Sequence, residues 1–476
     1  MVFSSPVFLF LFLPLTLLLV WLAGSTAARN AVLLVASLLF YAWGEGVYVL
    51  LMLATVLLNY GCGLAIDRST GRRSWLVLAV VVNLAALAWF KYANFFVDTL
   101  NALFAHQLDG PIHLEPVHLP IGISFFIFHS ISYVVDVYRG QAKAQRSPAI
   151  TTLYLALFPQ LVAGPIIRYH DVAAQFLERT LNTARFANGV RRFVVGLAKK
   201  VLIADQCARV ADAIFAVPAD EVPLVTAWLG AIAYALQIYF DFSGYSDMAI
   251  GLGRMLGFEF RENFDRPYIA TSIRNFWQRW HISLSTWFRD YLYIPLGGNR
   301  LGAARTYLNL FIVFFLTGLW HGASWNFVVW GLVHGLFLVF ERAGLGKLLE
   351  RAPRPLPHLY TLLVVLTAWV LFRLPDITQG WHYILGMYGI RPGDAVLHPA
   401  DLFLTPVTAL ALVIGALGAL NVHVLIGRVM GLRPMGQELA TGTRGTLEVL
   451  GLITLFLLVA MSVASSTYSP FIYFRF

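Results

Sequence analysis

Long apolar runs separated by short polar loops make up most of this chain. They recur from Pro6–Leu22 near the start to Leu447–Val463 near the end. A helix needs about 20 apolar residues to cross a bilayer, and several runs are nearer about 10. We therefore predict an all-α integral membrane protein with about 10 to 12 transmembrane helices plus re-entrant and interfacial helices. Every polar stretch is shorter than the domain minimum of about 50 residues, which favours a single multi-span domain over 1–476.

The uncharged run Thr306–Phe340 carries a histidine, His321, near its middle. As one helix this run would be about 52 Å long at about 1.5 Å per residue, longer than a hydrocarbon core of about 30 Å. The run should therefore break, and His321–Asn326 (HGASWN) is the predicted place. Gly322 favours a turn there, and Ser324 and Asn326 compete for backbone hydrogen bonds.

Basic residues flank this run on both sides, with Arg300 and Arg305 before it and Arg342 and Lys347 after it. By the positive-inside rule both ends face the cytoplasm, so the run predicts a hairpin with His321 at its tip. Arms of about 15 residues reach only about 23 Å, which leaves the tip inside the membrane. Irregular backbone at that depth must face protein or water. We expect a polar cavity, although the residues alone leave both a structural and a functional histidine open.

The segment Arg261–Arg300, just upstream, is dense in charged and aromatic residues. It predicts either an interfacial helix with snorkelling arginines or the wall of a polar funnel, with His281 as a second candidate histidine. His281, Ser285 and Phe288 would share one helical face. The residues that we expect to line the cavity come from this segment and from the predicted break: Trp277, Arg279, Ser285, Arg289, Asp290, Trp320, Ser324 and Asn326.

Two further stretches are polar within apolar surroundings. His170–Lys200 alternates basic and aromatic residues and predicts a basic helix on the cytoplasmic surface. It would be a positive-inside loop or a docking face for an acidic partner or acyl carrier. Asp241–Asp247 (DFSGYSD) predicts a helix break or a cavity lining. Both cysteines fit no metal or redox motif, and no metal site is expected.

Composition agrees with a membrane protein and argues against a nucleic-acid binder. Hydrophobic residues are 59% of the chain and charged residues only 12%, against roughly 25% charged in soluble domains. The net charge is +9, but the basic residues lie in short loops, whereas nucleic-acid binders gather them on one soluble face.

Several longer motifs together resemble the membrane-bound O-acyltransferase superfamily, closest to its bacterial alginate O-acetyltransferase branch, with D-alanyl transfer proteins of teichoic acid as a neighbouring branch. The resemblance runs nearly end to end, with its core motifs in 119–340; 344–445 carries no recognisable motif. The motifs are MVFSSPVFLFLFLPL, FKYANFF, LPIGISFFIFHSISYVVDVYRG, FPQLVAGPIIR, YFDFSGYSDMAIGLGRMLGF, FWQRWHISLSTWFRDYLYIPLGGNR, GLWHG and SSTYSPFIYFRF.

The resemblance implies a ring of helices around a central tunnel in the bacterial inner membrane. It assigns the catalytic histidine to His321 and the second motif histidine to His281. It implies an enzyme with no bound cofactor and with acetyl-CoA or another acyl thioester as its cytoplasmic donor. The acceptor would be a polysaccharide, reached directly or through periplasmic acyltransferase partners of the Ser-His-Asp type.

On this basis we expect an O-acetyltransferase that moves acetyl groups across the membrane for O-acetylation of an exopolysaccharide such as alginate. One alternative is transfer of D-alanyl or another acyl group to a cell-envelope polymer. A non-enzymatic transporter or flippase of an acylated intermediate is the other. The sequence shows no internal repeat, which weighs against transport.

Overall fold

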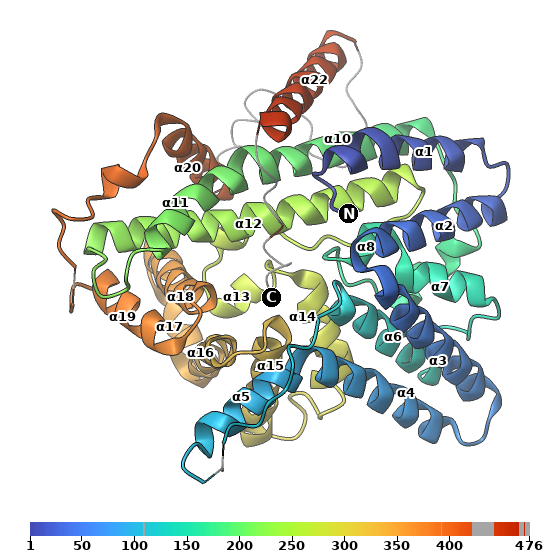
Figure 1. The fold of residues 1–476 in the computed structure, drawn as a ribbon, viewed down its shortest axis with the longest axis horizontal. Helices are drawn as coiled ribbons and strands as arrows, with labels where there is room; N and C mark the ends of the chain where they lie inside the picture. The colour runs from blue at the N-terminus through green and yellow to red at the C-terminus, as the bar shows by residue number, and fades with distance from the viewer. Residues whose placement is uncertain (108–109, 392, 421–441, 466–470, 472–476) are drawn as a thin grey trace. The chain divides into compact units, whose positions relative to one another are not determined.

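The computed structural model describes residues 1–107, 110–391, 393–420, 442–465 and 471 (Figure 1). Most of the C-terminal motif SSTYSPFIYFRF lies outside these residues. The described chain is helical and contains no β-strand, which confirms the predicted all-α class. It divides into two compact units, Met1–Val190 with Ala249–Arg261 and Arg191–Met248 with Glu262–Phe476. Helices α10 (Thr183–Ala198) and α12 (Leu224–Met255) contain residues of both units, and the predicted single domain stays a prediction.

The first unit is built on packed apolar helices. Helix α3 packs against α4 and α6, and α2 packs against α7. Between α3 and α4, the buried amides of Asn59 and Asn83 donate to each other over 2.8 and 3.2 Å, which satisfies polar groups that the apolar surroundings cannot. The helices of this unit are α1 (Leu13–Leu22), α2 (Thr26–Glu45), α3 (Val49–Arg68), α4 (Arg72–Leu87), α5 (Ala93–Leu103), α6 (Ile123–Tyr138), α7 (Pro148–Ala156), α8 (Phe158–Leu161) and α9 (Tyr169–Val172).

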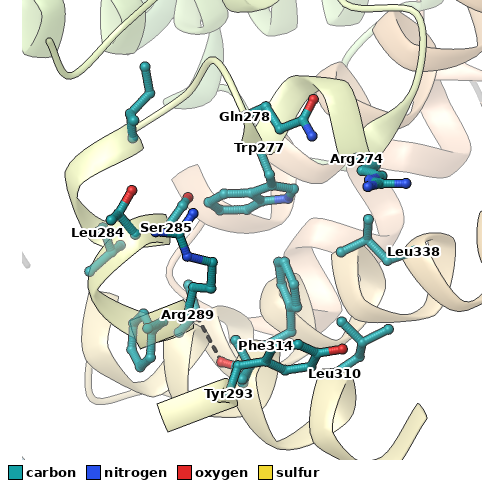
Figure 2. A pocket seen from close by; sticks show the side chains of 15 residues that line it. Arg274, Trp277, Gln278, Leu284, Ser285, Arg289, Tyr293, Leu310, Phe314 and Leu338 are labelled. Atoms are coloured by element: carbon teal, nitrogen blue, oxygen red, sulfur yellow. Dashed lines mark hydrogen bonds between the residues drawn. The ribbon is translucent and has the colours of Figure 1, made fainter. Parts of the chain in front are cut away.

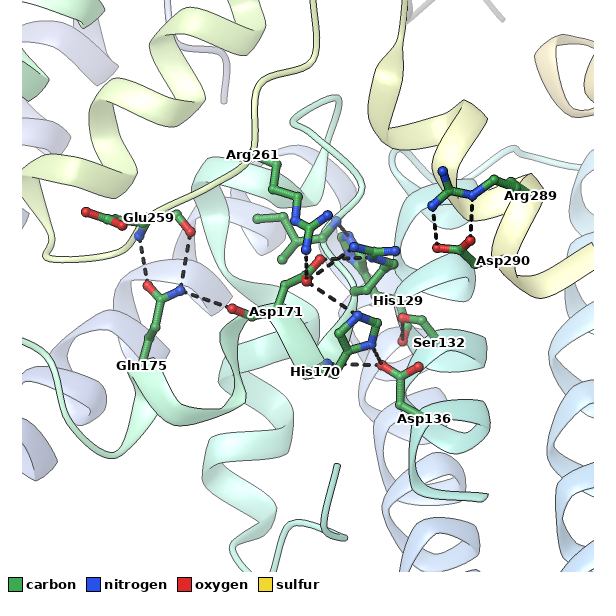
Figure 3. Close-up of polar contacts among 12 residues, drawn as sticks. His129, Ser132, Asp136, His170, Asp171, Gln175, Glu259, Arg261, Arg289 and Asp290 are labelled. Carbon is green, nitrogen blue, oxygen red and sulfur yellow. Dashed lines mark hydrogen bonds and ion pairs between the residues drawn. The ribbon is translucent and has the colours of Figure 1, made fainter. Parts of the chain in front are cut away.

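A polar network occupies the end of α6 and the start of α9 (Figure 3). His170 Nδ1 lies 2.8 Å from the buried Asp136 carboxylate, and its Nε2 lies 3.4 Å from Asp171. Arg168 and Arg261 also donate to Asp171, over 2.9 and 2.6 Å. These contacts hold α9 against the end of α6 by charge pairing, in addition to the burial of Tyr169 and Val172.

The second unit contains both candidate histidines. Helices α15 and α16 pack along each other, and α16, α18 and α19 lie together (Figure 1). The helices of this unit are α11 (Asp205–Phe215), α13 (Ile273–Trp277), α14 (Ile282–Phe288), α15 (Ala303–His321), α16 (Trp325–Phe340), α17 (Gly346–Arg351), α18 (Pro355–Arg373), α19 (Ile377–Met387), α20 (Pro406–Ala419) and α22 (Gly442–Ser465).

Seven helical stretches of the described chain are long and apolar enough to cross a membrane, and three apolar helices are shorter. Their outer faces expose large apolar side chains such as Leu50 and Leu410, as expected for lipid contact rather than water. The protein is therefore a multi-pass membrane protein. The seven long stretches are Thr26–Arg68, Arg72–Leu103, Leu224–Met255, Ala303–His321, Trp325–Arg351, Pro355–Arg373 and Gly445–Ser465.

The predicted break at Asp241–Asp247 is wrong, because α12 runs through it as one helix of 32 residues. Its carboxylates are satisfied without breaking the backbone. Asp247 accepts from Arg192 over 2.8 Å and from Lys199 over 2.6 Å, and Asp241 lies 2.8 Å from Lys200. Buried charges persist when they are paired in this way.

The same ion pairs correct the interpretation of His170–Lys200 as a surface basic helix. Only the part from Thr183 onward forms α10, and Arg192 and Lys200 are buried. Burial lowers the pKa of the Arg192 guanidinium, but the carboxylates of Glu262 and Asp247 outweigh it and hold that pKa above its usual range. Arg192 and Lys200 therefore form ion pairs inside the second unit, and their buried side chains do not form a docking surface.

Candidate active site

The predicted break in the uncharged run is confirmed. Helix α15 ends at His321, the chain is extended at Gly322 and Ser324, and α16 begins at Trp325. The hydroxyl of Ser324 donates to the Asn326 side-chain oxygen. The Asn326 amide in turn donates to the carbonyls of Leu371 and Leu374, over 3.2 and 2.8 Å. Two of the predicted lining residues thus tie the break to the end of α18.

His321 is 3% exposed and lies among aromatic rings. The ring centres of Trp320 and Trp330 each lie 5.0 Å from its own, and that of Phe372 lies 5.2 Å away, all edge to face. Phe372 belongs to the 344–445 region, in which the sequence shows no motif. The sequence alone gives no sign that this region contacts the histidine, and only the folded structure shows it.

His281 occupies a strained position immediately before α14. Its backbone angles, φ 44° and ψ 53°, are left-handed, a conformation that residues other than glycine adopt rarely and that clusters at functional sites. The charged segment is divided into short helical pieces, with His281 between α13 and α14, and is not the single interfacial helix that its pattern allowed. The imidazole is fully buried, and burial lowers its pKa to about 3. It is neutral near neutral pH.

Trp320 connects the two histidines. Its ring centre lies 5.9 Å from that of His281 and 5.0 Å from that of His321. The edge of Phe242 on α12 packs against His281 at 4.6 Å. The structure thus brings together three of the residues that the sequence singled out, although they are about 40 positions apart.

A cavity of about 520 Å³ lies between α14 and α15. Figure 2 shows Trp277, Ser285 and Arg289, all expected to line the site, around this cavity. Ile282, next to His281, lines it from α14, and Thr317, one helical turn before His321, lines it from α15. Residues four apart on a helix share a face. The lining thus comes within one residue of His281 and within one helical turn of His321, although neither histidine lines the cavity itself.

A second cavity of about 680 Å³ shares part of this lining, including Arg274 and Tyr293. Four cations line it: Arg274, Arg342, Lys347 and Arg354. Two carboxylates, those of Glu341 and Glu350, also line it, and the Glu341 carboxylate accepts from the backbone N–H groups of Ile273 and Arg274. The four cations still outnumber the two carboxylates. The cavity therefore favours an anionic ligand, a property that the spacing of these basic residues in the sequence did not reveal.

The remaining two predicted lining residues form local ion pairs. Arg279 donates to Asp265 over 3.2 Å and to the Asn275 side chain over 3.1 Å. Asp290 accepts from Arg289 over 2.7 Å (Figure 3). Neither lines the two cavities described above, and their part in a tunnel stays a prediction.

Comparison with known proteins identifies the family of this chain. The model of the membrane-bound O-acyltransferase family matches residues 36–375. The chain is 42% identical to a probable alginate O-acetylase, AlgI, of Azotobacter vinelandii over the full length of both proteins. It is 49% identical to the protein of the same name from Pseudomonas aeruginosa over 82% of this chain and 75% of the relative. A peptidoglycan O-acetyltransferase of Helicobacter pylori is 35% identical over 84% and 81%.

The family match spans both compact units and includes His281, His321 and the helices that line the two cavities. Identity above 40% across the whole length of a relative leaves no part of the described fold outside the comparison. This chain belongs to the membrane-bound O-acyltransferase family and is an O-acyltransferase.

Proposed function

We propose that this protein is a bacterial inner-membrane O-acetyltransferase that supplies acetyl groups for O-acetylation of an exopolysaccharide. The observation that carries the proposal is the cavity between α14 and α15, whose lining includes Ile282, next to His281, and Thr317, one helical turn before His321. The acetyl group is inferred from the relatives, whose names specify O-acetylation of alginate and of peptidoglycan. The polysaccharide acceptor rests on the same names.

The donor in this proposal is a cytoplasmic acyl thioester such as acetyl-CoA. Its anionic part would bind in the basic cavity beside Arg342, Lys347 and Arg354, and its thioester arm would enter the neighbouring, more apolar cavity. Cations that meet phosphate groups supply binding energy and orientation. Trp277 lines the inner cavity and its ring lies 5.8 Å from Trp330, which in turn contacts His321. The arm would thus approach His321 along an aromatic wall.

His321 would act as the general base in the transfer. Its imidazole takes the proton of the acceptor hydroxyl while that oxygen attacks the thioester carbonyl. The carbon–sulfur bond then breaks, the acetyl group becomes an oxygen ester, and the departing thiolate takes up a proton. The acceptor is a sugar hydroxyl or a hydroxyl of a periplasmic acyltransferase partner. In the second form of this proposal, His321 is the point at which the acyl group is relayed.

Mutation of the two histidines tests the catalytic assignment. His321→Ala should abolish acetyl transfer by purified protein while the protein still inserts and purifies normally. His281→Ala should lower the rate less, because His281 orients or relays. His382→Ala on α19 is the matched control and should keep full activity. Full acetylation by His321→Ala would remove that residue from the mechanism.

The donor site has its own test. Replacement of both Arg342 and Lys347 by alanine should raise KM for acetyl-CoA but not for acetyl-pantetheine, which lacks the phosphate groups. Arg351→Ala, an exposed cation on α17 outside the cavity lining, is the control. If KM rises equally for both donors, the basic cavity does not bind the anionic part of the donor.

Two other functions make different predictions. D-alanyl transfer would require an aminoacyl thioester on a carrier protein as donor, and acetyl-CoA would then be inactive. A flippase would move an acylated intermediate across vesicles without forming a new ester. Acetyl transfer measured in purified protein, beside flux measured in vesicles, separates these classes.

A further inference from the structure

Asn263 supports the first turn of α14, although it lies 18 positions before His281. The left-handed backbone of His281 prevents an ordinary cap by that residue, and its side chain makes no cap hydrogen bond. The backbone carbonyl of Asn263 instead accepts from Ile282 N over 2.9 Å. Its side-chain oxygen accepts from Ser283 N over 3.1 Å. Two helix-start N–H groups are thus satisfied by one buried residue.

These contacts fix the orientation of the Asn263 amide. A backbone N–H can only donate, so the side-chain atom that faces Ser283 N must be the oxygen. The amide nitrogen then faces the other way, where it donates to the Ser246 hydroxyl of α12 over 3.0 Å. Asn263 is 1% exposed and Ser246 is 2% exposed. Water cannot substitute for these partners, and the amide has one stable orientation.

The same oxygen faces the ring of His281. Oδ1 of Asn263 lies 3.2 Å from His281 Nδ1, and an amide oxygen is an acceptor only. Ser283 Oγ, whose proton is directed to Asn263 over 2.8 Å, lies 3.5 Å from the same ring nitrogen. Both neighbours of Nδ1 thus present oxygen lone pairs. A neutral imidazole has one N–H, and these contacts place it on Nδ1.

We propose that Asn263 is a positioning residue that holds His281 as the Nδ1–H tautomer, so that Nε2 keeps the lone pair that can accept a hydrogen bond during acyl transfer. The inference rests on the proposed function for its catalytic consequence, but the tautomer itself does not depend on it. Burial, which lowers the pKa of His281 to about 3, keeps the ring neutral and so makes the choice of tautomer meaningful. The partner of one ring nitrogen commonly decides the role of the other.

The neighbouring residue reinforces this arrangement. Glu262 pairs with Arg192 of α10, and Arg192 also donates to Asp247 of α12 over 2.8 Å. Asp247 directly follows Ser246, the partner of the Asn263 amide. Arg192 thus links the residue before Asn263 to the residue after Ser246, through an exposed carboxylate on one side and a buried one on the other, and holds both partners of the Asn263–Ser246 hydrogen bond in place.

Nuclear magnetic resonance of histidine-labelled protein in liposomes tests the tautomer directly. The full-length protein carries ¹³C,¹⁵N-histidine, and the His281 signals are identified by their absence in His281→Gln. We expect Nδ1–H in the wild type and in Asn263→Asp, whose carboxylate keeps the acceptor. Asn263→Leu should lose this signature. An Nε2–H ring in the wild type, or an unchanged ring in Asn263→Leu, would overturn the proposal.

Kinetics then separates positioning from stability. Asn263→Leu should lower kcat by about 10- to 100-fold, as for other orienting partners, with little change in KM. Asn263→Asp should retain most of the wild-type kcat, because its carboxylate can still accept from Ser283 N and from His281 Nδ1. This variant remains informative if Asn263→Leu does not fold. Equal loss in both variants, with an unchanged tautomer in Asn263→Asp, would reduce Asn263 to a helix cap. If the wild type transfers no acetyl group, the proposed function fails while the resonance result still decides the tautomer.

Discussion

Gly318→Ala should reduce catalysis through the packing of the helix hairpin. Gly318 lies on α15 where this helix crosses α16, and a Cβ atom there would overlap the Phe327 carbonyl oxygen and lie 3.1 Å from Val328 Cα. Gly331 faces it from α16, with its own Cβ position 3.0 Å from Gly318 Cα. The two backbones are therefore in direct contact, as at other glycine-lined membrane helix pairs.

The size of the effect of Gly318→Ala on stability follows from two opposing contributions. Alanine favours a helix over glycine by about 1 kcal/mol, whereas overpacking costs about 1 to 3 kcal/mol. Since the atoms that Cβ meets belong to backbone, no side-chain rotation relieves the overlap. Ordinary carbon contacts need about 3.5 Å, so the helices must separate by roughly 1 Å. His321 follows Gly318 by one turn, and a misplacement of about 1 Å can lower kcat about 100-fold.

The assay is the initial rate of acetyl transfer together with the apparent melting temperature in detergent. Gly61→Ala on α3 is the matched control, because no atom lies within 4 Å of its Cβ position. It should keep the wild-type rate and melt at the same or a higher temperature. Wild-type rate and stability in Gly318→Ala would refute the close packing of α15 on α16.

Three further outcomes are expected. Arg192→Met, which breaks a buried ion pair, should cost about 3 kcal/mol of stability. Loss of the exposed ion pair between Arg185 and Glu259 should cost under about 1 kcal/mol, and thermal unfolding of the two variants compares these losses. Ser324→Cys should react with water-soluble thiol reagents in membranes if the break faces the predicted tunnel, and an inert cysteine would contradict that tunnel. His281 binds a proton more readily unfolded, near pH 6.5, than folded, near about pH 3. Its contribution to stability is therefore complete above pH 6.5 and falls by about 2 kcal/mol at pH 5, a loss that should be absent in a melting series of His281→Gln.

Local chemistry allowed the sequence to predict the hairpin. An uncharged run too long for one span, with Gly322, Ser324 and Asn326 near its middle, left few places for a break, and the structure breaks at Gly322–Ser324. The all-helical class followed from apolar runs for the same reason. Both predictions depend on interactions between residues that are close in the chain.

Partners distant in the chain explain what the sequence could not predict. Asp247 was expected at a helix break or a cavity lining because Asp241–Asp247 is polar within apolar surroundings. The cations that pair with it, Arg192 and Lys199, lie outside α12. The periodicity of the sequence does not predict this pairing. Asn263 was overlooked for the same reason. It lies within a charged segment, and its partners are known only once that segment is placed beside α12 and α14.

The two histidines differ in a way that supports His321 as the residue that takes the proton. His281 has its Nδ1 hydrogen bond to Asn263. Both imidazoles are buried, which disfavours a positive charge on either ring, so the difference lies in their hydrogen bonds and in their places on the helices. His321 is the last residue of α15, a helix of 19 residues. The carbonyl end of a helix stabilises a positive charge by about 0.3 to 1 kcal/mol, which lowers the cost of the imidazolium that forms when the hydroxyl proton is removed. A neutral, oriented His281 beside Trp320 can then hold a hydrogen bond without competing for that proton. In the proposed mechanism two chemically identical side chains would thus serve as a base and as an orienting group, and the ranking of the two alanine variants tests that assignment.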